Sequence, residues 1–293
     1  MKPTTKEAFM KSEVDLHTHS TASDGTLSPS GLVKEALNKG LKAIALTDHD
    51  TVSGLPEAFA ASEGTSLTII PGVEISSRLG VKDIHILGYY INNGDDVFLS
   101  RLKDLVERRT RRNLKVIDRM NRDGIAVSMD ALKAYNPDTV VTRAHFARYL
   151  ADNGYVRDKK QAFKEYLGVG CPYYIPRDPI SPERAVDIIK DNGGLAYLAH
   201  PGIYKLEDDR FASLLNSLIS RGLDGIEVYY STHTEEETAG FLRVAREYHL
   251  AISGGSDFHG SNKPDIELGS GKNNLELPES LWTEMKSLAK RSE

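Results

Sequence analysis

The chain has one cysteine, Cys171, and one tryptophan, Trp282, among its 293 residues. A single cysteine excludes an internal disulfide and a metal site built from several thiolates, so any bound metal must use His, Asp and Glu side chains. We expect Cys171 to be an inert packing residue. The chain also lacks an apolar run near the roughly 20 residues that a membrane-spanning helix needs, so we expect no membrane segment.

Neither sign of charge dominates, because 37 basic residues face 42 acidic ones and the net charge is −5. This balance predicts no broad basic surface for long duplex nucleic acid, but it allows a local site for a short anionic substrate. The first fifteen residues contain no apolar core and no small-residue cleavage site, so we expect no secretory signal. With the single cysteine, this favours a cytoplasmic protein.

Short apolar runs alternate with amphipathic segments along most of the chain. The segments "SPSGLVKEALNKG" and "SPERAVDIIKDNGG" begin with Ser-Pro and end with Gly, as helices do. Alternating strands and helices predict an α/β fold, either a barrel or an open doubly wound sheet, with reactive residues at the carboxyl ends of the strands. The expected strands are "KAIAL" (42–46), "SLTIIPGVEI" (66–75), "IHILGYYI" (84–91), "GLAYLAH" (194–200), "GIEVYY" (225–230) and "LAISGGSD" (250–257).

The alternation breaks between residues 96 and 177, where consecutive helical patterns with few strand signals predict a helical insertion. Its basic cluster could face an anionic ligand. We interpret it instead as a solvated helix face, because Asp104 and Glu107 lie nearby at helical spacing. The cluster consists of Arg108, Arg109, Arg111 and Arg112.

Nitrogen and oxygen donors gather at or beside the ends of the expected strands. In "DLHTHSTASDG" (15–25), the side chains of Asp15, His17 and His19 point the same way along a strand, and two imidazoles at this spacing can chelate one ion. A polar loop that happens to hold two histidines is the alternative. Nine donors exceed what one ion needs, so we predict a cluster of two or three ions. The donors are His17, His19, Asp24, His49, Glu74, His85, His200, Asp257 and His259.

The motifs "VDLHTHSTASDGTLSP", "LTDHDTVSG", "PGVEIS", "HILGY", "AHPG" and "GSDFHG", in this order, resemble the PHP (polymerase and histidinol phosphatase) family of metal-dependent phosphoesterases. The resemblance spans residues 14–100 and 178–262. With its SDG motif and an insertion containing "TRAHFARYL", the chain is most similar to the branch of nucleoside 3′,5′-bisphosphate phosphatases and 5′-to-3′ exonucleases of short RNA. The segment "GVGCPYYIP" departs from that branch at Cys171 and Tyr173.

The resemblance implies a distorted (β/α)7 TIM-like barrel with a helical insertion. The barrel domain would be discontinuous, residues 13–95 and 178–293, and the insertion, residues 96–177, would cover the substrate site. For this branch the resemblance also implies a trinuclear metal site, and we expect two to three divalent ions, for which imidazole and carboxylate donors suit Mn, Fe and Zn alike. A metal-bridging hydroxide rather than a side chain is expected to attack phosphorus. The implied ligands are His17, His19, Glu74 and Asp257 for the first ion, Glu74, His85 and His200 for the second, and Asp24, His49 and His259 for the third.

Other polar residues are expected to orient the metal ligands or to bind the substrate. Asp15, Asp48 and Asp50 are candidates to orient histidine rings, although Asp50 could equally cap the following helix. Arg143 and His145 lie near the start of an expected helix that Thr142 caps. The resemblance implies that they contact a second substrate phosphate. A guanidinium suits phosphate, and a structural ion pair of Arg143 is the alternative.

The expected reaction is hydrolysis of a phosphate from nucleoside 3′,5′-bisphosphates, such as adenosine 3′,5′-bisphosphate to AMP. Trimming of short oligoribonucleotides from the 5′ end is its extension. The alternatives are another PHP phosphatase, such as a histidinol phosphate phosphatase, and a non-catalytic module that binds metal or nucleotide. Trp282 and the final helical segment fit barrel closure and an oligomer contact equally, and the sequence leaves the oligomeric state undecided.

Overall fold

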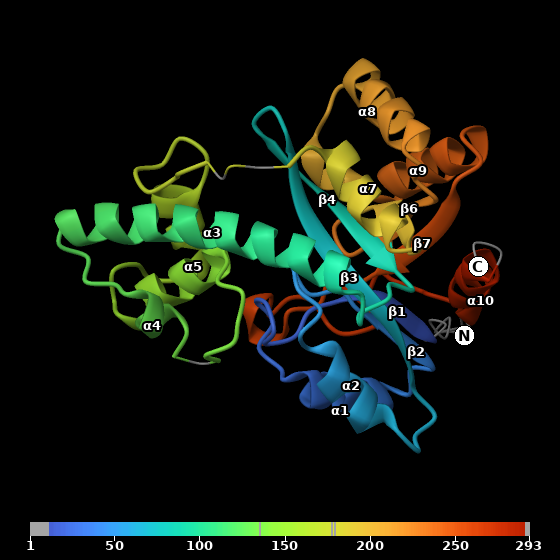
Figure 1. The fold of residues 1–293 in the computed structure, drawn as a ribbon, viewed down its shortest axis with the longest axis horizontal. Helices are drawn as coiled ribbons and strands as arrows, with labels where there is room; N and C mark the ends of the chain where they lie inside the picture. The colour runs from blue at the N-terminus through green and yellow to red at the C-terminus, as the bar shows by residue number, and fades with distance from the viewer. Residues whose placement is uncertain (1–11, 135, 177, 179, 291–293) are drawn as a thin grey trace, which may run out of the picture.

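The computed structural model describes residues 12–134, 136–176, 178 and 180–290, and in this part of the chain seven strands form one sheet in chain order. The last strand returns to the first, where the Asp257 amide donates to the His17 carbonyl at 2.9 Å and the His19 amide donates to the Phe258 carbonyl at 3.0 Å. The sheet is therefore a nearly closed barrel, as expected (Figure 1). The strands are β1 Val14–Thr18, β2 Ala43–Leu46, β3 Thr68–Leu79, β4 Lys82–Tyr89, β5 Leu195–Leu198, β6 Gly225–Tyr230 and β7 Ala251–Gly255.

One strand runs against the others, and this distorts the barrel. β4 is antiparallel to both β3 and β5, and a tight hairpin at Gly80, whose φ is 60°, joins it to β3. Glu74 and His85 therefore lie inside long strands and not at strand ends, which corrects the expectation for these two donors. Because β4 is reversed, His85 near its start still lies at the same end of the barrel as the carboxyl ends of the parallel strands.

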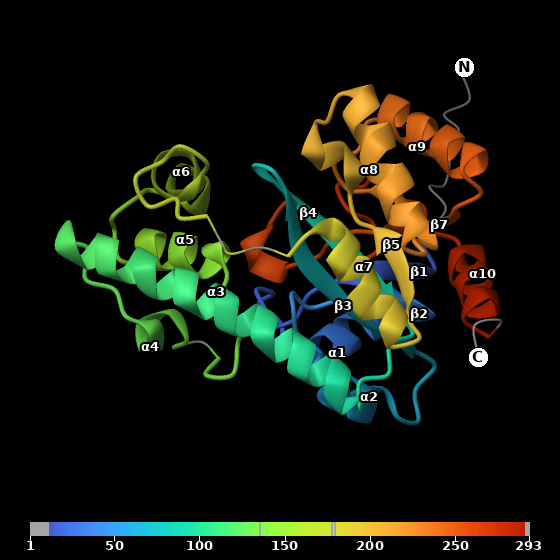
Figure 2. The ribbon, with the colours of Figure 1, turned by 45° about the horizontal axis from the view of Figure 1, so that its top comes forward.

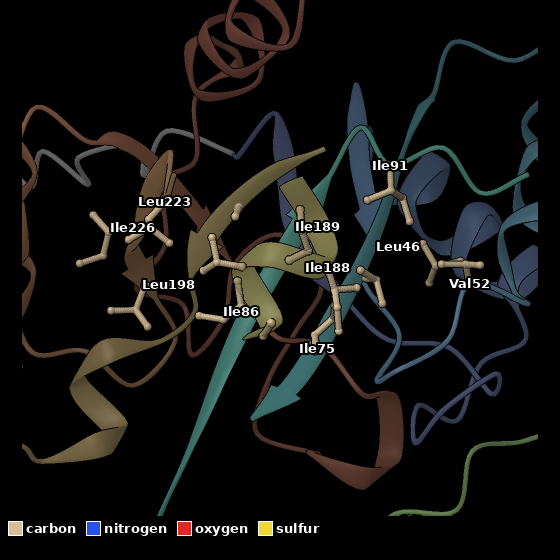
Figure 3. Packing of buried hydrophobic residues seen from close by; sticks show 14 of the residues in the cluster. Leu46, Val52, Ile75, Ile86, Ile91, Ile188, Ile189, Leu198, Leu223 and Ile226 are labelled. Carbon is tan, nitrogen blue, oxygen red and sulfur yellow. The ribbon is translucent and has the colours of Figure 1, made fainter. Parts of the chain in front are cut away.

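Helices pack around the outside of the sheet. Ser28 and Ser181 cap α1 and α7 by accepting hydrogen bonds from the Gly31 amide at 3.0 Å and the Arg184 amide at 3.2 Å, as the Ser-Pro starts predict. Figure 3 shows the resulting packing, in which Ile75 and Ile86 of the sheet lie beside Ile188 and Ile189 of α7. The barrel helices are α1 Pro29–Lys39, α2 Leu55–Ser62, α7 Pro182–Asp191, α8 Asp208–Ser220, α9 Glu235–Glu247 and α10 Glu279–Ala289, with the short turns η2 Pro201–Tyr204 and η3 Gly260–Asn262.

The C-terminal helix α10 packs on β1 and β7. Its Trp282 indole donates a hydrogen bond to the Tyr90 hydroxyl at 3.0 Å. The Trp282 side chain also packs against a cluster of buried residues that includes Val14 and Leu16 of β1. Trp282 thus takes part in closing the barrel. None of the described helices is both long and apolar enough to cross a bilayer.

The long helix α3 connects the barrel to the insertion. Near its start, Phe98, Leu102 and Leu105 pack into the hydrophobic core between the sheet and the surrounding helices. Further along α3, Val116 and Met120 belong to a separate core within the insertion. Figure 2 shows α4, α5 and α6 gathered along the outer half of α3. The insertion is therefore held at a fixed place beside the barrel. Its elements are α3 Asp96–Arg122, α4 Met129–Leu132, α5 Arg143–Asp152, α6 Lys159–Ala162 and the π-helical turn η1 Phe163–Leu167.

Candidate metal centre

The nine donors predicted from the sequence lie together at one end of the barrel. Among the described residues, their ligand atoms form four overlapping groups, in each of which all atoms are within 4.8 Å of one another. Shared members join the groups into one cluster, which is buried except for partial exposure of His49 and His85. The groups are His19, Asp24, His49 and His259; His17, His19 and Asp257; His17, Glu74 and His200; and His49, Glu74 and His85.

Glu74 lies at the centre of this cluster. One carboxylate oxygen, Oε1, lies 2.7 Å from His85 Nδ1 and 2.9 Å from His200 Nε2. The other, Oε2, lies 3.4 Å from His17 Nε2 and 3.3 Å from His19 Nε2. Both oxygens of the Glu74 carboxylate therefore lie beside imidazole nitrogens with which they could share a bound cation.

The donors fit a divalent ion in distance and in chemistry. Nε2 of His17 and of His19 lie 3.3 to 3.6 Å from Glu74 Oε2 and Asp257 Oδ1. Four ligands at about 2.1 Å from a tetrahedral ion are about 3.4 Å apart. Within the described residues both Nε2 atoms are buried without a hydrogen-bond partner, which is rare unless a metal or water satisfies them.

A further set of donors surrounds Asp24. Its Oδ1 lies 3.2 Å from His259 Nε2, 3.9 Å from His49 Nε2 and 4.0 Å from His19 Nδ1. These separations also suit ligands that share one ion.

Two residues outside the set of nine donors orient the ligands. Glu227 is fully buried and accepts hydrogen bonds from His17 Nδ1 at 3.0 Å and from the His200 amide at 2.7 Å. It thereby turns His17 Nε2 toward the cluster. The Tyr230 hydroxyl donates to Asp257 Oδ2 at 2.7 Å and leaves Oδ1 facing the histidines.

The backbone is unusual where these ligands sit. Asp257 has φ of 57° and His200 has φ of 26°, both in the left-handed region that costs a non-glycine residue about 1 to 3 kcal/mol. The neighbouring Gly255 lets the chain pass close to β1, because a Cβ there would lie 2.3 Å from the His17 Cβ. The fold therefore holds the ligands in place against local strain.

Asp15 and Asp48 hold the loops that carry ligands, rather than histidine rings. Asp15 accepts hydrogen bonds from the Ser256 amide at 2.9 Å and the Gly269 amide at 2.7 Å. Asp48 accepts from the hydroxyls of Ser20 and Ser23, each at 2.6 Å. These contacts tie β1 to the loop after β7, and the loop after β1 to the loop after β2.

The helix-capping alternative for Asp50 is wrong, because α2 starts later and its N-cap residue is Gly54. Asp50 accepts a hydrogen bond from the Ser76 amide at 2.8 Å and forms a buried ion pair with Arg109 of α3. Its carboxylate therefore connects the barrel to the insertion.

The interpretation of the basic cluster on α3 as a solvated face is wrong for half of its members. Arg109 and Arg112 are each only 6% exposed, whereas Arg108 pairs with Asp104 as expected. A helix turns about 100° per residue, so positions three apart share a face, and this face of α3 packs toward the barrel. The buried guanidiniums consequently face the metal centre.

A cavity of about 270 Å³ separates the donor cluster from the insertion. Its wall carries three arginines of the insertion and one lysine of the barrel, so it suits an anion. Sequence reasoning missed Lys263, which pairs with Asp257, and Phe163; the position of Lys263 just after the "GSDFHG" motif was the available signal. The cavity is lined by Asp24, His49, Ser76, His85, His259, Asn262 and Lys263 of the barrel and by Arg109, Arg112, Thr142, Arg143, Ala144 and Phe163 of the insertion.

Helix α5 presents Arg143 to this cavity. Thr142 caps the helix by accepting from the Ala144 amide at 3.1 Å, as expected. His145 is buried behind Thr142, whose amide donates to His145 Nδ1 at 3.0 Å, and burial lowers the pKa of the imidazole to about 4. The Arg143 guanidinium donates to Asp83 at 2.7 Å. Arg143 thus lines the cavity and also forms an ion pair with Asp83, which is the structural alternative that the sequence left open.

Opposite charges in the cluster shift one another's pKa. Burial disfavours the Glu74 carboxylate, but His49 and His85 outweigh burial and hold its pKa well below the usual range. Burial likewise disfavours the charged form of His19, but Asp257 and Glu74 raise its pKa to about 9. A binding cation must therefore displace a proton from His19.

Known proteins share this architecture. The PHP domain family matches residues 15–170. The 5′-3′ exoribonuclease of Haemophilus influenzae is 37% identical over 85% of this chain and 91% of its own length. The 3′,5′-nucleoside bisphosphate phosphatase of Chromobacterium violaceum is 33% identical over 94% of this chain and 96% of its own.

A solved structure from Bifidobacterium adolescentis, assigned to the metal-dependent phosphoesterases, is 29% identical. It superposes with a TM-score of 0.85 over 94% of this chain and 96% of its own. The family match covers more than half of the chain and the relatives cover nearly all of it, and the chain therefore belongs to the PHP domain family of metal-dependent phosphoesterases.

Proposed function

We propose that the chain hydrolyses one phosphate from nucleoside 3′,5′-bisphosphates, such as adenosine 3′,5′-bisphosphate to AMP, and trims short oligoribonucleotides from the 5′ end at the same site. Two relatives that align with most of the chain carry these two names. The observation that carries the proposal is the cavity, whose wall combines metal donors with Arg109, Arg112, Arg143 and Lys263. A substrate with one phosphate at the donors and another at the guanidiniums fits this arrangement.

We infer that two to three divalent ions of Mn, Fe or Zn occupy the donor cluster. When bound, such ions polarise phosphoryl oxygens and lower the pKa of water. The donor separations around Glu74 and around Asp24 support this inference. The proposed sets are His17, His19, Glu74 and Asp257; Glu74, His85 and His200; and Asp24, His49 and His259.

The insertion, residues 96–177, is proposed to act as the wall that recognises the substrate, with residues 13–95 and 178–293 as the barrel domain. Arg109 is held on this wall by Asp50 and by the Ser76 hydroxyl at 2.9 Å, so its guanidinium is positioned before substrate arrives. Arg143, which is 30% exposed at its side chain, binds the phosphate that does not react. His145 supports Arg143 through the cap of α5 and does not itself contact substrate.

A panel of phosphate esters tests this function. The chain, reconstituted with Mn²⁺, should release phosphate from adenosine 3′,5′-bisphosphate with a kcat/KM at least about tenfold above that for histidinol phosphate, because one extra charged contact is worth about 1.5 to 3 kcal/mol. A 5′-phosphorylated tetraribonucleotide should yield mononucleotides. A preference for histidinol phosphate would select the other type of PHP phosphatase. Retained metal with no turnover on any ester would select the non-catalytic module.

A further inference from the structure

Phe163 is an apolar side chain on the wall of a charged cavity. The residue is 39% exposed, and it lines the same cavity as Arg112, Arg143 and Lys263. By contrast, the buried apolar side chains of the same segment, such as Leu167, belong to the core of the insertion. Phe163 therefore contributes a hydrophobic surface at a place where the remaining wall suits phosphate.

The local backbone fixes Phe163 in this position. Phe163 opens the π-helical turn η1, in which the Gly168 amide donates to the Phe163 carbonyl at 2.8 Å. A Cβ at position 168 would lie 2.6 Å from that carbonyl oxygen, so this turn requires glycine. π-helical turns are rare and occur frequently at functional sites. On the far side of the turn, Tyr166 stacks on Tyr173 with ring centroids 5.8 Å apart, which anchors η1 in the insertion.

A chain of hydrogen bonds also ties this segment to the metal donors. Lys159, one turn before Phe163, donates to the Ser261 carbonyl at 2.6 Å and to Asn262 Oδ1 at 3.1 Å. The Asn262 side-chain nitrogen Nδ2 in turn donates to the Asp24 carbonyl at 2.6 Å. The segment that carries Phe163 is thus tied to the donor cluster as well as to the core of the insertion.

We propose that Phe163 is the platform on which the nucleobase of the substrate stacks. This inference rests on the proposed function, because a nucleotide is the ligand that joins two phosphates to a flat ring. The guanidiniums and the donor cluster take the phosphates, and the exposed aromatic face takes the base. Stacking accepts any base because every base has a π-face, so Phe163 selects nucleotides as a class.

Steady-state kinetics on two substrates test this role. For adenosine 3′,5′-bisphosphate, Phe163→Ala should raise KM about 5- to 150-fold with little change in kcat, which is the loss expected for one base stacked on an aromatic ring. The abasic analogue, in which hydrogen replaces the base, should show the same KM in both proteins. Phe163→Tyr should retain the wild-type KM, and Phe163→Leu should resemble Phe163→Ala, because leucine keeps the apolar bulk without a π-face.

Tyr155→Ala is the matched control, because Tyr155 is a 36% exposed aromatic residue of the same insertion that does not line the cavity, and its KM should not change. An unchanged KM in Phe163→Ala would overturn the inference. An equal loss on the abasic analogue would also overturn it, since this would indicate a structural role for the ring.

A binding measurement separates this inference from the proposed function. In Phe163→Trp, added AMP should quench indole emission beyond any change from Trp282, whereas Tyr155→Trp should show no added quenching. Quenching in a protein that hydrolyses no bisphosphate would support the platform and contradict the proposed reaction. Turnover without quenching and without a KM effect in Phe163→Ala would contradict the platform alone.

Discussion

Replacement of Arg143 by alanine separates substrate recognition from chemistry. Arg143 lines the cavity from the start of α5, and its guanidinium pairs with Asp83 at 2.7 Å. We expect Arg143→Ala to lower kcat/KM for adenosine 3′,5′-bisphosphate and to change hydrolysis of a simple monophosphate far less, because the donor cluster is untouched.

The magnitude follows from the surroundings of the guanidinium. A hydrogen bond to a charged group contributes about 1.5 to 3 kcal/mol. Arg143 must share its charge between the phosphate and Asp83, and a pair exposed to this extent is worth at most about 1 kcal/mol. The net loss is therefore about 0.5 to 3 kcal/mol, or about 2- to 150-fold in kcat/KM.

The assay compares phosphate release by three variants on both substrates. Arg122→Ala is the control, because Arg122 is an exposed arginine at the outer end of α3 that pairs with Asp118. Asp83→Asn should leave bisphosphate hydrolysis unchanged or raise it, since it removes the competitor of the phosphate. If Asp83→Asn and Arg143→Ala cause the same loss on both substrates, the pair is structural and the recognition role is refuted.

Further changes probe the cluster and its links to the insertion. Glu74→Gln should lower the metal content of the purified chain, since it removes the shared charge; unchanged content by elemental analysis would contradict this. In the metal-free chain, the raised pKa of His19 stabilises the fold below about pH 6.5, and this stability should be lost as pH rises through about 9. Urea unfolding of the metal-free chain in chelator measures this free energy of unfolding at each pH. A free energy of unfolding that rises between about pH 6.5 and about pH 9 would contradict the prediction. Arg109→Met should cost about 3 to 5 kcal/mol of unfolding free energy, because it breaks the buried ion pair between Arg109 and Asp50 by removing one of its two charges. A loss of unfolding free energy below about 1 kcal/mol would show that the ion pair between Arg109 and Asp50 contributes little to stability.

Much of the barrel could be predicted from local patterns. The apolar run at residues 225–230 coincides with β6, and the Ser-Pro starts locate α1 and α7 to the residue. The reversal of β4 was not predicted, because apolar patterning does not record strand direction. Gly80, between two long strand patterns, was the available sign of a hairpin.

Some residues of the candidate site could also be predicted from the sequence, and others could not. Its metal donors were predictable because they follow strand patterns in short motifs, and the barrel brings these motifs together. Arg109 and Arg112 were misjudged, because charge spacing on α3 does not reveal which face packs against Asp50, a residue 59 positions away. His145 forms its capping box with an imidazole in place of the usual Glu or Gln, so the helix start concealed its structural role.

Titration of the metal-free chain with Mn²⁺, followed by phosphate release from adenosine 3′,5′-bisphosphate, tests the central claim most directly. The account predicts no release in chelator and an activity that rises to a plateau at two to three ions per chain. Full activity in chelator, or no release at any metal concentration, would contradict it.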